Sequence, residues 1–228
     1  MQADIYQIYY KPSQRPYLDL AFTPYDNSFN PNSHMHEWPI LENALTIADA
    51  NGLDVVGFVS WQWNAKTHLT GKTFIDFIKD NPDHTIWAAK PYLPPNYPFI
   101  NPFVHGEHWH PGIMAAAKDL ITAAGYTTNL ETDPMPMIFF DFFAMTRAEW
   151  QEFLLELARV KMIAMETPDI RRIMFETDAH YEPNPNVKFW IFFAERFINL
   201  YISERRKKFA ALDYRHQWFS FWNWQDNG

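Results

Sequence analysis

The feature that most constrains the fold is the run at residues 54–60, where nearly every side chain is apolar. A strand of this composition is buried on both faces, as in the centre of a sheet that helices cover on each side. Further short runs rich in β-branched and aromatic residues lie at 4–10, 85–90 and 137–145. The sequence therefore predicts an α/β fold with a mostly parallel central sheet flanked by helices.

Helical patterns fill the intervals between these runs. Residues 39–48 carry apolar side chains at helical spacing, and Pro39 and Gly52 mark the two ends. Thr70 is placed to cap a helix over 71–79, and Thr146 begins a capping-box pattern for a helix that reaches about 161. A helix from Pro111 to about 124, a short strand at 126–130 and a last long helix over 186–208 are also predicted.

The composition favours one domain over residues 1–228, in which the last helix and an aromatic tail begin at about 186. A chain of 228 residues with 47% hydrophobic residues can bury a sizeable core. It contains no cysteine, which excludes disulfides and thiolate chemistry and favours the cytoplasm. No secretion signal and no apolar run of about 20 residues is visible, so no membrane span is expected.

The charge balance bears on the choice of partner. A net charge of −8 argues against a general binder of nucleic acid. Residues 205–208 form a basic run, which we interpret as a solvated helix end, with a membrane or nucleic-acid contact as the alternative. The sequence does not indicate an oligomeric state.

The segment Gly106-Glu107-His108-Trp109-His110-Pro111-Gly112 is the strongest candidate for chemistry. It places a carboxylate and two imidazoles within four residues, in a predicted loop just before a helix N-terminus. Such a terminus can hold phosphate or carboxylate, and the imidazoles titrate near neutrality. Glu107, His108 and His110 are therefore candidate catalytic residues. In the alternative, these side chains satisfy one another and cap the helix.

Other candidates are single residues. Asp141 stands in an apolar run, where a carboxylate needs either a structural arginine partner or a ligand. Lys66, which follows Ser60 and Trp61, could face a phosphate or be a surface lysine. Glu195 and Arg196 are expected to join neighbouring elements. With seven glycines, the chain has no P-loop, no G-x-G-x-x-G and no G-x-S-x-G pattern.

A succession of segments resembles a small family of bacterial and viral sugar transferases, related to nucleotide-sugar glycosyltransferases of the GT-A type. The resemblance covers most of the chain and is carried, in order, by residues 5–10, 24–27, 56–61 with 66–67, 71–78, 106–112, 141–144 with 149–150, and 195–197.

The resemblance implies a nucleotide-sugar donor near the first strand and a hydroxyl acceptor. Donor-binding residues would be Tyr25, Asp26, Asn27, Ser60, Trp61 and Lys66. Catalytic and acceptor groups would be Glu107, His108, His110 and Asp141. GT-A enzymes usually carry an Asp-x-Asp metal motif, which is not found at a strand end here, so the use of Mg²⁺ or Mn²⁺ stays open. The acceptor would be a surface glycan or, less in keeping with the acidic charge, a modified base in viral DNA.

Two other function classes compete with transfer. A metal-dependent hydrolase would use His108, His110 and Glu107 with a remote carboxylate such as Asp141, and His34 and His36 are further potential ligands. A non-catalytic glycan-binding module would stack sugars on exposed indoles. Most of the tryptophans are expected in the core, and the candidates for exposure are Trp61, Trp63, Trp109, Trp218, Trp222 and Trp224.

Overall fold

A computed structural model describes residues 1–30, 38–139, 142–179 and 187–214. His34, His36, Asp141 and the tryptophans of the aromatic tail lie outside the described residues. The strands are β1 (Ala3–Tyr9), β2 (Thr23–Asp26), β3 (Val55–Ser60), β4 (Ile86–Pro91), β5 (Phe143–Thr146) and β6 (Ala210–Tyr214).

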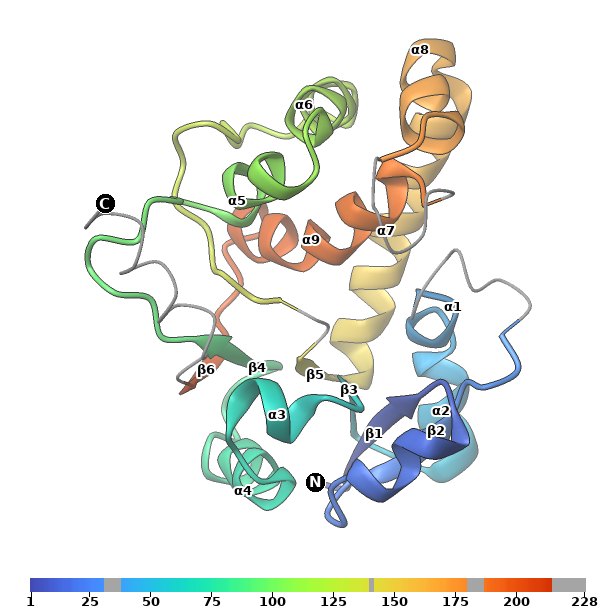
Figure 1. Ribbon diagram of the computed structural model, residues 1–228, viewed down its shortest axis with the longest axis vertical. Coiled ribbons are helices and arrows are strands. Elements are labelled where there is room, and N and C mark those ends of the chain that lie inside the picture. The colour runs from blue at the N-terminus through green and yellow to red at the C-terminus, as the bar shows by residue number, and fades with distance from the viewer. Residues whose placement is uncertain (31–37, 140–141, 180–186, 215–228) are drawn as a thin grey trace.

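One six-stranded sheet forms the centre of the fold, in the order β2-β1-β3-β5-β4-β6. Strand β5 runs antiparallel to both of its neighbours, and the other pairs are parallel. The predicted α/β class with a mostly parallel sheet is therefore confirmed. Figure 1 shows α3 and α4 on one side of this sheet and the remaining labelled α-helices on the other.

The helices form the two outer layers. They are α1 (Trp38–Leu41), α2 (Ala44–Asn51), α3 (Trp63–Thr67), α4 (Gly71–Asp80), α5 (Pro102–Trp109), α6 (Ile113–Ala123), α7 (Arg147–Glu166), α8 (Pro168–Arg171) and α9 (Phe189–Glu204), with a 3₁₀-helix η1 (Pro12–Tyr17) and a short π-helix η3 (Arg172–Glu176). No described helix combines the length and the hydropathy needed to cross a membrane.

The alternation of side chains along the strands divides the interior into two cores. Tyr6 and Ile8 of β1 belong to the larger core beneath α1, α2 and α5–α9, while Ile5 belongs to the smaller core beneath α3 and α4. All residues of β3 are buried, as predicted for residues 54–60. Gly57 lies where a Cβ would be 2.5 Å from Ile5 Cδ1, so glycine permits the close approach of β1.

Of two predicted strands, one does not form and the other is shorter than predicted, and in both segments side chains of α9 bind the backbone. Thr127 and Thr128 donate their amides to Glu204, and residues 126–130 form no strand. In the apolar run at 137–145, the Asn199 side chain accepts from the Ile138 amide and donates to its carbonyl. Among the described residues of this run, strand β5 covers Phe143–Thr146.

The two predicted threonine caps form, but the Glu149 carboxylate bonds to other groups than the predicted capping box requires. Thr70 accepts from the Thr73 amide and Thr146 from the Glu149 amide. The Glu149 carboxylate does not complete a capping box. It accepts instead from Tyr201 Oη at 2.5 Å and Thr85 Oγ1 at 2.7 Å, and it lies 3.0 Å from Lys207 Nζ.

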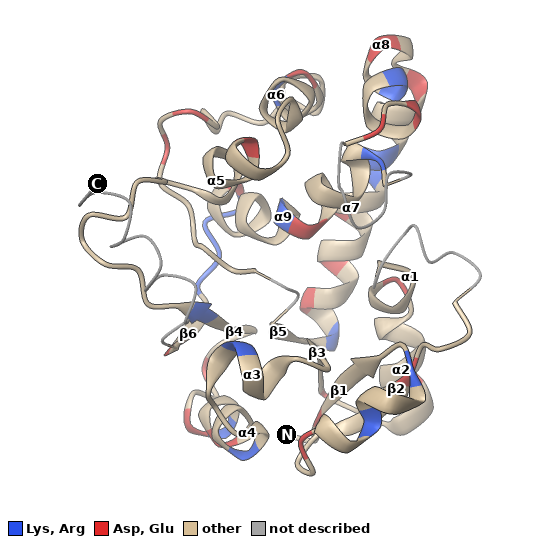
Figure 2. Cartoon of the chain, viewed as in Figure 1, with Lys and Arg blue, Asp and Glu red and all other residues tan. Residues whose placement is uncertain are grey.

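The basic run at 205–208 directly follows the end of α9 and is largely exposed, in keeping with a solvated helix end, but two of its cations also form ion pairs. Figure 2 shows it in the connection between α9 and β6. Lys207 forms ion pairs with Glu149 and Glu152, and Arg205 pairs with Glu156. These contacts join the connection to α7, so two of its four cations have structural partners.

Candidate functional site

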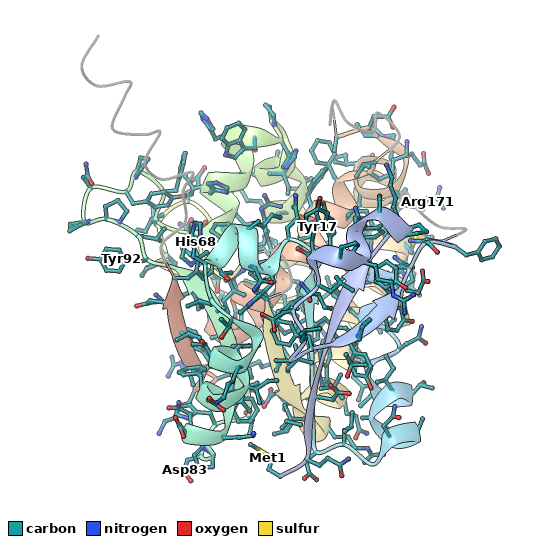
Figure 3. All side chains as sticks on the ribbon, turned by 60° about the horizontal axis from the view of Figure 1, so that its bottom comes forward. Met1, Tyr17, His68, Asp83, Tyr92 and Arg171 are labelled. Carbon is teal, nitrogen blue, oxygen red and sulfur yellow. The ribbon has the colours of Figure 1, made fainter. Side chains whose placement is uncertain are left out.

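The carboxyl ends of β1, β3 and β4 meet at one edge of the sheet because these strands run in the same direction. In Figure 3, Met1 and Asp83 precede strands and lie at one end of the molecule, whereas Tyr17 and His68 follow strands and lie toward the other. The chain leaves β1 toward β2 on one side and leaves β3 toward β4 on the other. Ligands of open α/β sheets bind at such a switch point, here between β1 and β3.

Gln7 joins the two strands at this switch point. Its side chain is fully buried, and Nε2 donates to the carbonyls of Ser60 and Trp61 at 3.2 and 3.4 Å. Its Oε1 accepts from the Asp19 amide at 2.7 Å. The sequence analysis did not select Gln7, although a lone polar residue in the apolar run at 4–10 was the available signal.

Ser60 and Trp61 lie where β3 ends. Ser60 Oγ accepts from the Gln62 amide at 3.2 Å. The half-buried Trp61 ring lies 6.4 Å from the ring of Tyr17 on η1. Two aromatic rings thus lie beside the switch point, one after β1 and one after β3.

The predicted Tyr25-Asp26-Asn27 group lies at the end of β2, next to the end of β1. Tyr9 Oη donates to Asp26 Oδ2 at 2.7 Å, and the Asn27 amide donates to the Tyr9 carbonyl at 2.8 Å. Hydrogen bonds from the Ser28 side chain and backbone, and then from Tyr9, hold the pKa of Asp26 below its usual value. The edge therefore carries an exposed, oriented and ionised carboxylate.

Asp19 anchors the loop that follows η1. It accepts from Asn64 Nδ2 at 2.8 Å, from the Gly71 amide at 2.8 Å and from the Ala21 amide at 3.0 Å. Burial acts to raise the pKa of Asp19, but these hydrogen bonds outweigh it and the pKa lies below the usual value. Lys66 is half-buried on the neighbouring helix α3, and its phosphate-binding role stays a prediction.

The segment 106–112 is not the predicted loop. Residues 106–109 belong to α5, which begins with Asn101 as its cap: Asn101 Oδ1 accepts from the amides of Phe103 and Val104 at 2.9 and 3.0 Å. Helix α6 begins at Ile113 rather than at Pro111. The Asn101-Pro102 pair is a strong start signal that the sequence analysis passed over.

Glu107 occupies the helix terminus that was predicted to bind an anion. Its two carboxylate oxygens accept from the amides of Gly112 and Met114 at 2.9 and 2.8 Å. The terminus of α6 is thus capped by the chain's own carboxylate, which is the alternative considered for this segment. The prediction of a free anion site here is wrong.

The two histidines of the segment lie in different environments. His108 is exposed, with its ring 5.0 Å from Trp109 and 5.5 Å from Phe99. His110 is buried and stacks on Phe192 at 3.6 Å. Within the described parts of the chain, no three carboxylate or imidazole groups come together as metal ligands.

Arg196 joins α9 to α5. Its buried guanidinium donates from Nε to the Pro102 carbonyl at 3.0 Å and from Nη1 to the Phe192 carbonyl at 2.8 Å. Glu195 lies 3.9 Å from Nη1. Burial lowers the pKa of Arg196. The guanidinium packs against Gly106, where an added Cβ would be 2.5 Å from Nε.

His105 is the residue of this region that the sequence analysis missed. Its Nε2 accepts from Trp109 Nε1 at 3.2 Å. Burial, then the nearby Arg196 charge and the other two histidines, lower the pKa of His105 to about 3. Residues 105, 108 and 109 share one helix face, a pattern that was hidden because the segment was predicted to be a loop.

No protein-family model and no curated protein matches the sequence. Among solved structures, the apo structure of the bifunctional glycosyltransferase WbbM is similar, with a TM-score of 0.49 and 13% identity over 94% of this chain. This chain spans only 45% of the WbbM chain. So distant a likeness carries no argument about activity, and the assignment of function rests on the geometry of the site.

Proposed function

We propose that the protein is a glycosyltransferase that binds a nucleotide-sugar donor at the switch point between β1 and β3. The observation that carries the proposal is the grouping of Asp26, Ser60 and Trp61 at the carboxyl edge of three parallel strands. This edge is where open α/β sheets bind ligands.

Asp26 is suited to the ribose of the donor. In nucleotide-binding sheets, a carboxylate near the end of a neighbouring strand accepts hydrogen bonds from ribose hydroxyls. Asp26 follows β2, is ionised, and is oriented by Tyr9. A ribose diol donating to Asp26 would place the base beside the Tyr17 and Trp61 rings and direct the diphosphate toward Lys66.

The acceptor side of the proposal uses the face of α5. Glu107 is bound to backbone amides, so its proposed role changes from base to positioning residue for the turn that carries His108. The exposed imidazole of His108 would take the acceptor hydroxyl proton as that oxygen bonds to the anomeric carbon and the bond to the diphosphate breaks. His110 supports the turn, and Asp141 stays a prediction as a further catalytic group.

A protein-held divalent site does not fit the described carboxylates at this edge. Asp19 already accepts three hydrogen bonds, and no cluster of three ligands forms among the described residues. Mg²⁺ or Mn²⁺ would therefore enter bound to the diphosphate, as Mg²⁺ often does at phosphate sites.

A thermal-shift panel tests the proposal. Purified protein is heated with UDP, GDP, CDP, ADP and dTDP and their sugars, each with and without Mg²⁺ or Mn²⁺. A ligand at about 100 times its Kd stabilises the native state by about 2.7 kcal/mol, which corresponds to a shift of roughly 5–10 °C for a domain of this size. A shift with one nucleotide family supports the proposal, and no shift with any of them refutes it.

A further inference from the structure

We propose that the exposed face of α5 is a saccharide-binding platform, in which Trp109 stacks on the apolar face of a sugar ring and His105 fixes the indole in place. The proposal rests on the proposed function in one respect: the bound saccharide would be the acceptor of the transfer. The platform itself consists of Trp109, His105, His108 and Phe99.

The exposure of Trp109 is the first observation. Its side chain is 49% exposed, although the tryptophans of the two cores are at most 4% exposed. These core residues are Trp38, Trp63, Trp87, Trp150 and Trp190. An indole exposed to water does not gain the large free energy that an aromatic side chain gains when it is buried in a core or an interface. Such an exposed aromatic is a common element of ligand surfaces, whereas the core residues are explained by folding.

The orientation of Trp109 is the second observation. Its Nε1–H donates to His105 Nε2 at 3.2 Å, so the polar atom of the indole is satisfied by the protein while its ring stays exposed. His105 can accept only when Nε2 carries no proton. Burial and then Arg196 lower the pKa of His105 to about 3, so the imidazole is neutral at neutral pH, and it accepts this hydrogen bond in its Nδ1–H tautomer. The ring is therefore oriented before any ligand arrives, which reduces the entropy lost on binding.

Aromatic rings pack against one another within and around the platform. His105 lies 5.2 Å from Phe99 and 5.0 Å from Phe139, and His108 lies edge-on to Trp109 at 89°. His108 is exposed beside the indole. A sugar ring offers C–H groups on one face and hydroxyls at its rim. The platform offers an aromatic face and an imidazole that can hydrogen-bond at the rim.

The chemistry of this surface favours a neutral saccharide over other occupants. The only charged residue in α5 is Glu107, whose carboxylate is already bound to backbone amides. A net charge of −8 opposes a polyanion such as nucleic acid. A protein partner would need a wide, contiguous apolar patch; exposed apolar side chains such as Leu155, Met162 and Met165 lie instead on α7.

The position of the platform fits an acceptor. Helix α5 follows β4, whose carboxyl end lies at the same edge of the sheet as the ends of β1 and β3. A saccharide on α5 would therefore approach the edge at which the donor is proposed to bind.

The test is a glycan array of neutral hexose and N-acetylhexosamine oligosaccharides, followed by titration of each binder against the wild type and five variants. Trp109→Ala should weaken binding at least about tenfold, because it removes the stacking surface. Trp109→Phe should retain binding within about threefold. His105→Phe should weaken it by about three- to tenfold, and His105→Gln, which keeps an acceptor, should restore part of the loss. Leu155→Ala, which truncates an exposed apolar side chain on α7 (65% exposed), is the matched control and should bind as the wild type.

Two results would refute the proposed platform. The first is that no oligosaccharide binds at 10 mM (~10⁻² M, the weak limit of specific recognition). The second is that Trp109→Ala binds oligosaccharides as tightly as Leu155→Ala does. The nucleotide thermal shifts of the same variants separate this proposal from the donor site. Nucleotide binding without saccharide binding refutes the platform alone. Saccharide binding through Trp109 without any nucleotide shift refutes the transferase and leaves a glycan-binding surface.

Discussion

Replacing Gly106 by alanine has two opposing effects on stability: alanine has the higher helix propensity, but its Cβ would lie too close to Arg196. The geometry of this contact decides whether the variant is more or less stable than the wild type. Gly106 lies inside α5, where alanine would ordinarily stabilise the protein by about 1 kcal/mol. The added Cβ, however, would lie 2.5 Å from Nε and 2.9 Å from Cζ of Arg196. A free side chain could move away at little cost. Arg196 is 7% exposed and bonded to the carbonyls of Pro102 and Phe192, so moving it breaks both bonds.

The magnitude follows from those two hydrogen bonds. Each bond from a charged donor contributes roughly 1.5–3 kcal/mol, so losing both costs about 3–6 kcal/mol. The propensity gain of about 1 kcal/mol offsets part of this. Gly106→Ala should therefore lower the free energy of unfolding by about 2–5 kcal/mol, measured by urea denaturation followed by circular dichroism.

A double-mutant cycle with Arg196→Met isolates the contact. In the Arg196→Met background the guanidinium is gone, so Gly106→Ala should cost much less, with a coupling free energy of at least about 1.5 kcal/mol. The reasoning is refuted if Gly106→Ala alone is as stable as the wild type or more stable. It is equally refuted if the two changes are additive.

Three further predictions concern stability. Glu107→Gln should lower the free energy of unfolding by about 1–2 kcal/mol, because one amide oxygen cannot replace the carboxylate that caps α6; an unchanged denaturation midpoint would contradict the cap. Asn101→Ala should lower the free energy of unfolding by roughly 2–4 kcal/mol, because it removes the α5 cap and leaves the Leu130 and Asp133 carbonyls without their donor. Denaturation of Asn101→Ser, whose hydroxyl keeps the cap but replaces neither carbonyl bond, should give an intermediate value. For Glu156, the hydrogen bond from Arg159 outweighs burial and, with Tyr126, lowers the pKa from 4.5 to about 2. Its stabilisation is thus present above pH 4.5 and lost as pH falls toward 2. Glu156→Gln should be about 1–2 kcal/mol less stable than the wild type at pH 7, allowing for solvent screening, and this gap should narrow by pH 3; a constant gap would contradict the assignment.

The main strands and the α/β fold class could be predicted because the pattern that indicates each strand lies within the sequence of that strand. A nearly continuous apolar run such as residues 54–60 indicates a strand that helices cover on both faces of the sheet. Thr70 and Thr146 cap their helices within one turn. The failures at 126–130 and 137–145 have the opposite cause. There the backbone bonds to Glu204 and Asn199 from a distant helix, and no pattern within the segment encodes such contacts.

The candidate site could be predicted only in part. The group at Tyr25-Asp26-Asn27 came from the family resemblance and not from a local pattern, and its role in donor binding stays a prediction. The segment 106–112 was selected for its composition, but it was predicted to be a loop, whereas residues 106–109 belong to a helix. The contact between His105 and Trp109, which lie one helical turn apart, was therefore missed. Gln7 was missed because its partners, the Ser60 and Trp61 carbonyls, lie more than fifty residues away in sequence.

The most direct test of the central claim is calorimetric titration of the nucleotide that stabilises the protein against two matched variants. Asp26 and Asp49 are both exposed, and hydrogen bonds lower the pKa of each, from Ser28 for Asp26 and from Arg147 for Asp49. Only Asp26 lies at the carboxyl edge of the sheet; Asp49 lies on α2. Asp26→Asn should weaken nucleotide binding by about 10- to 100-fold, the value of a hydrogen bond to a charged group, and Asp49→Asn should leave Kd unchanged. Equal Kd values for the wild type and Asp26→Asn would contradict the claim that the donor binds at this edge.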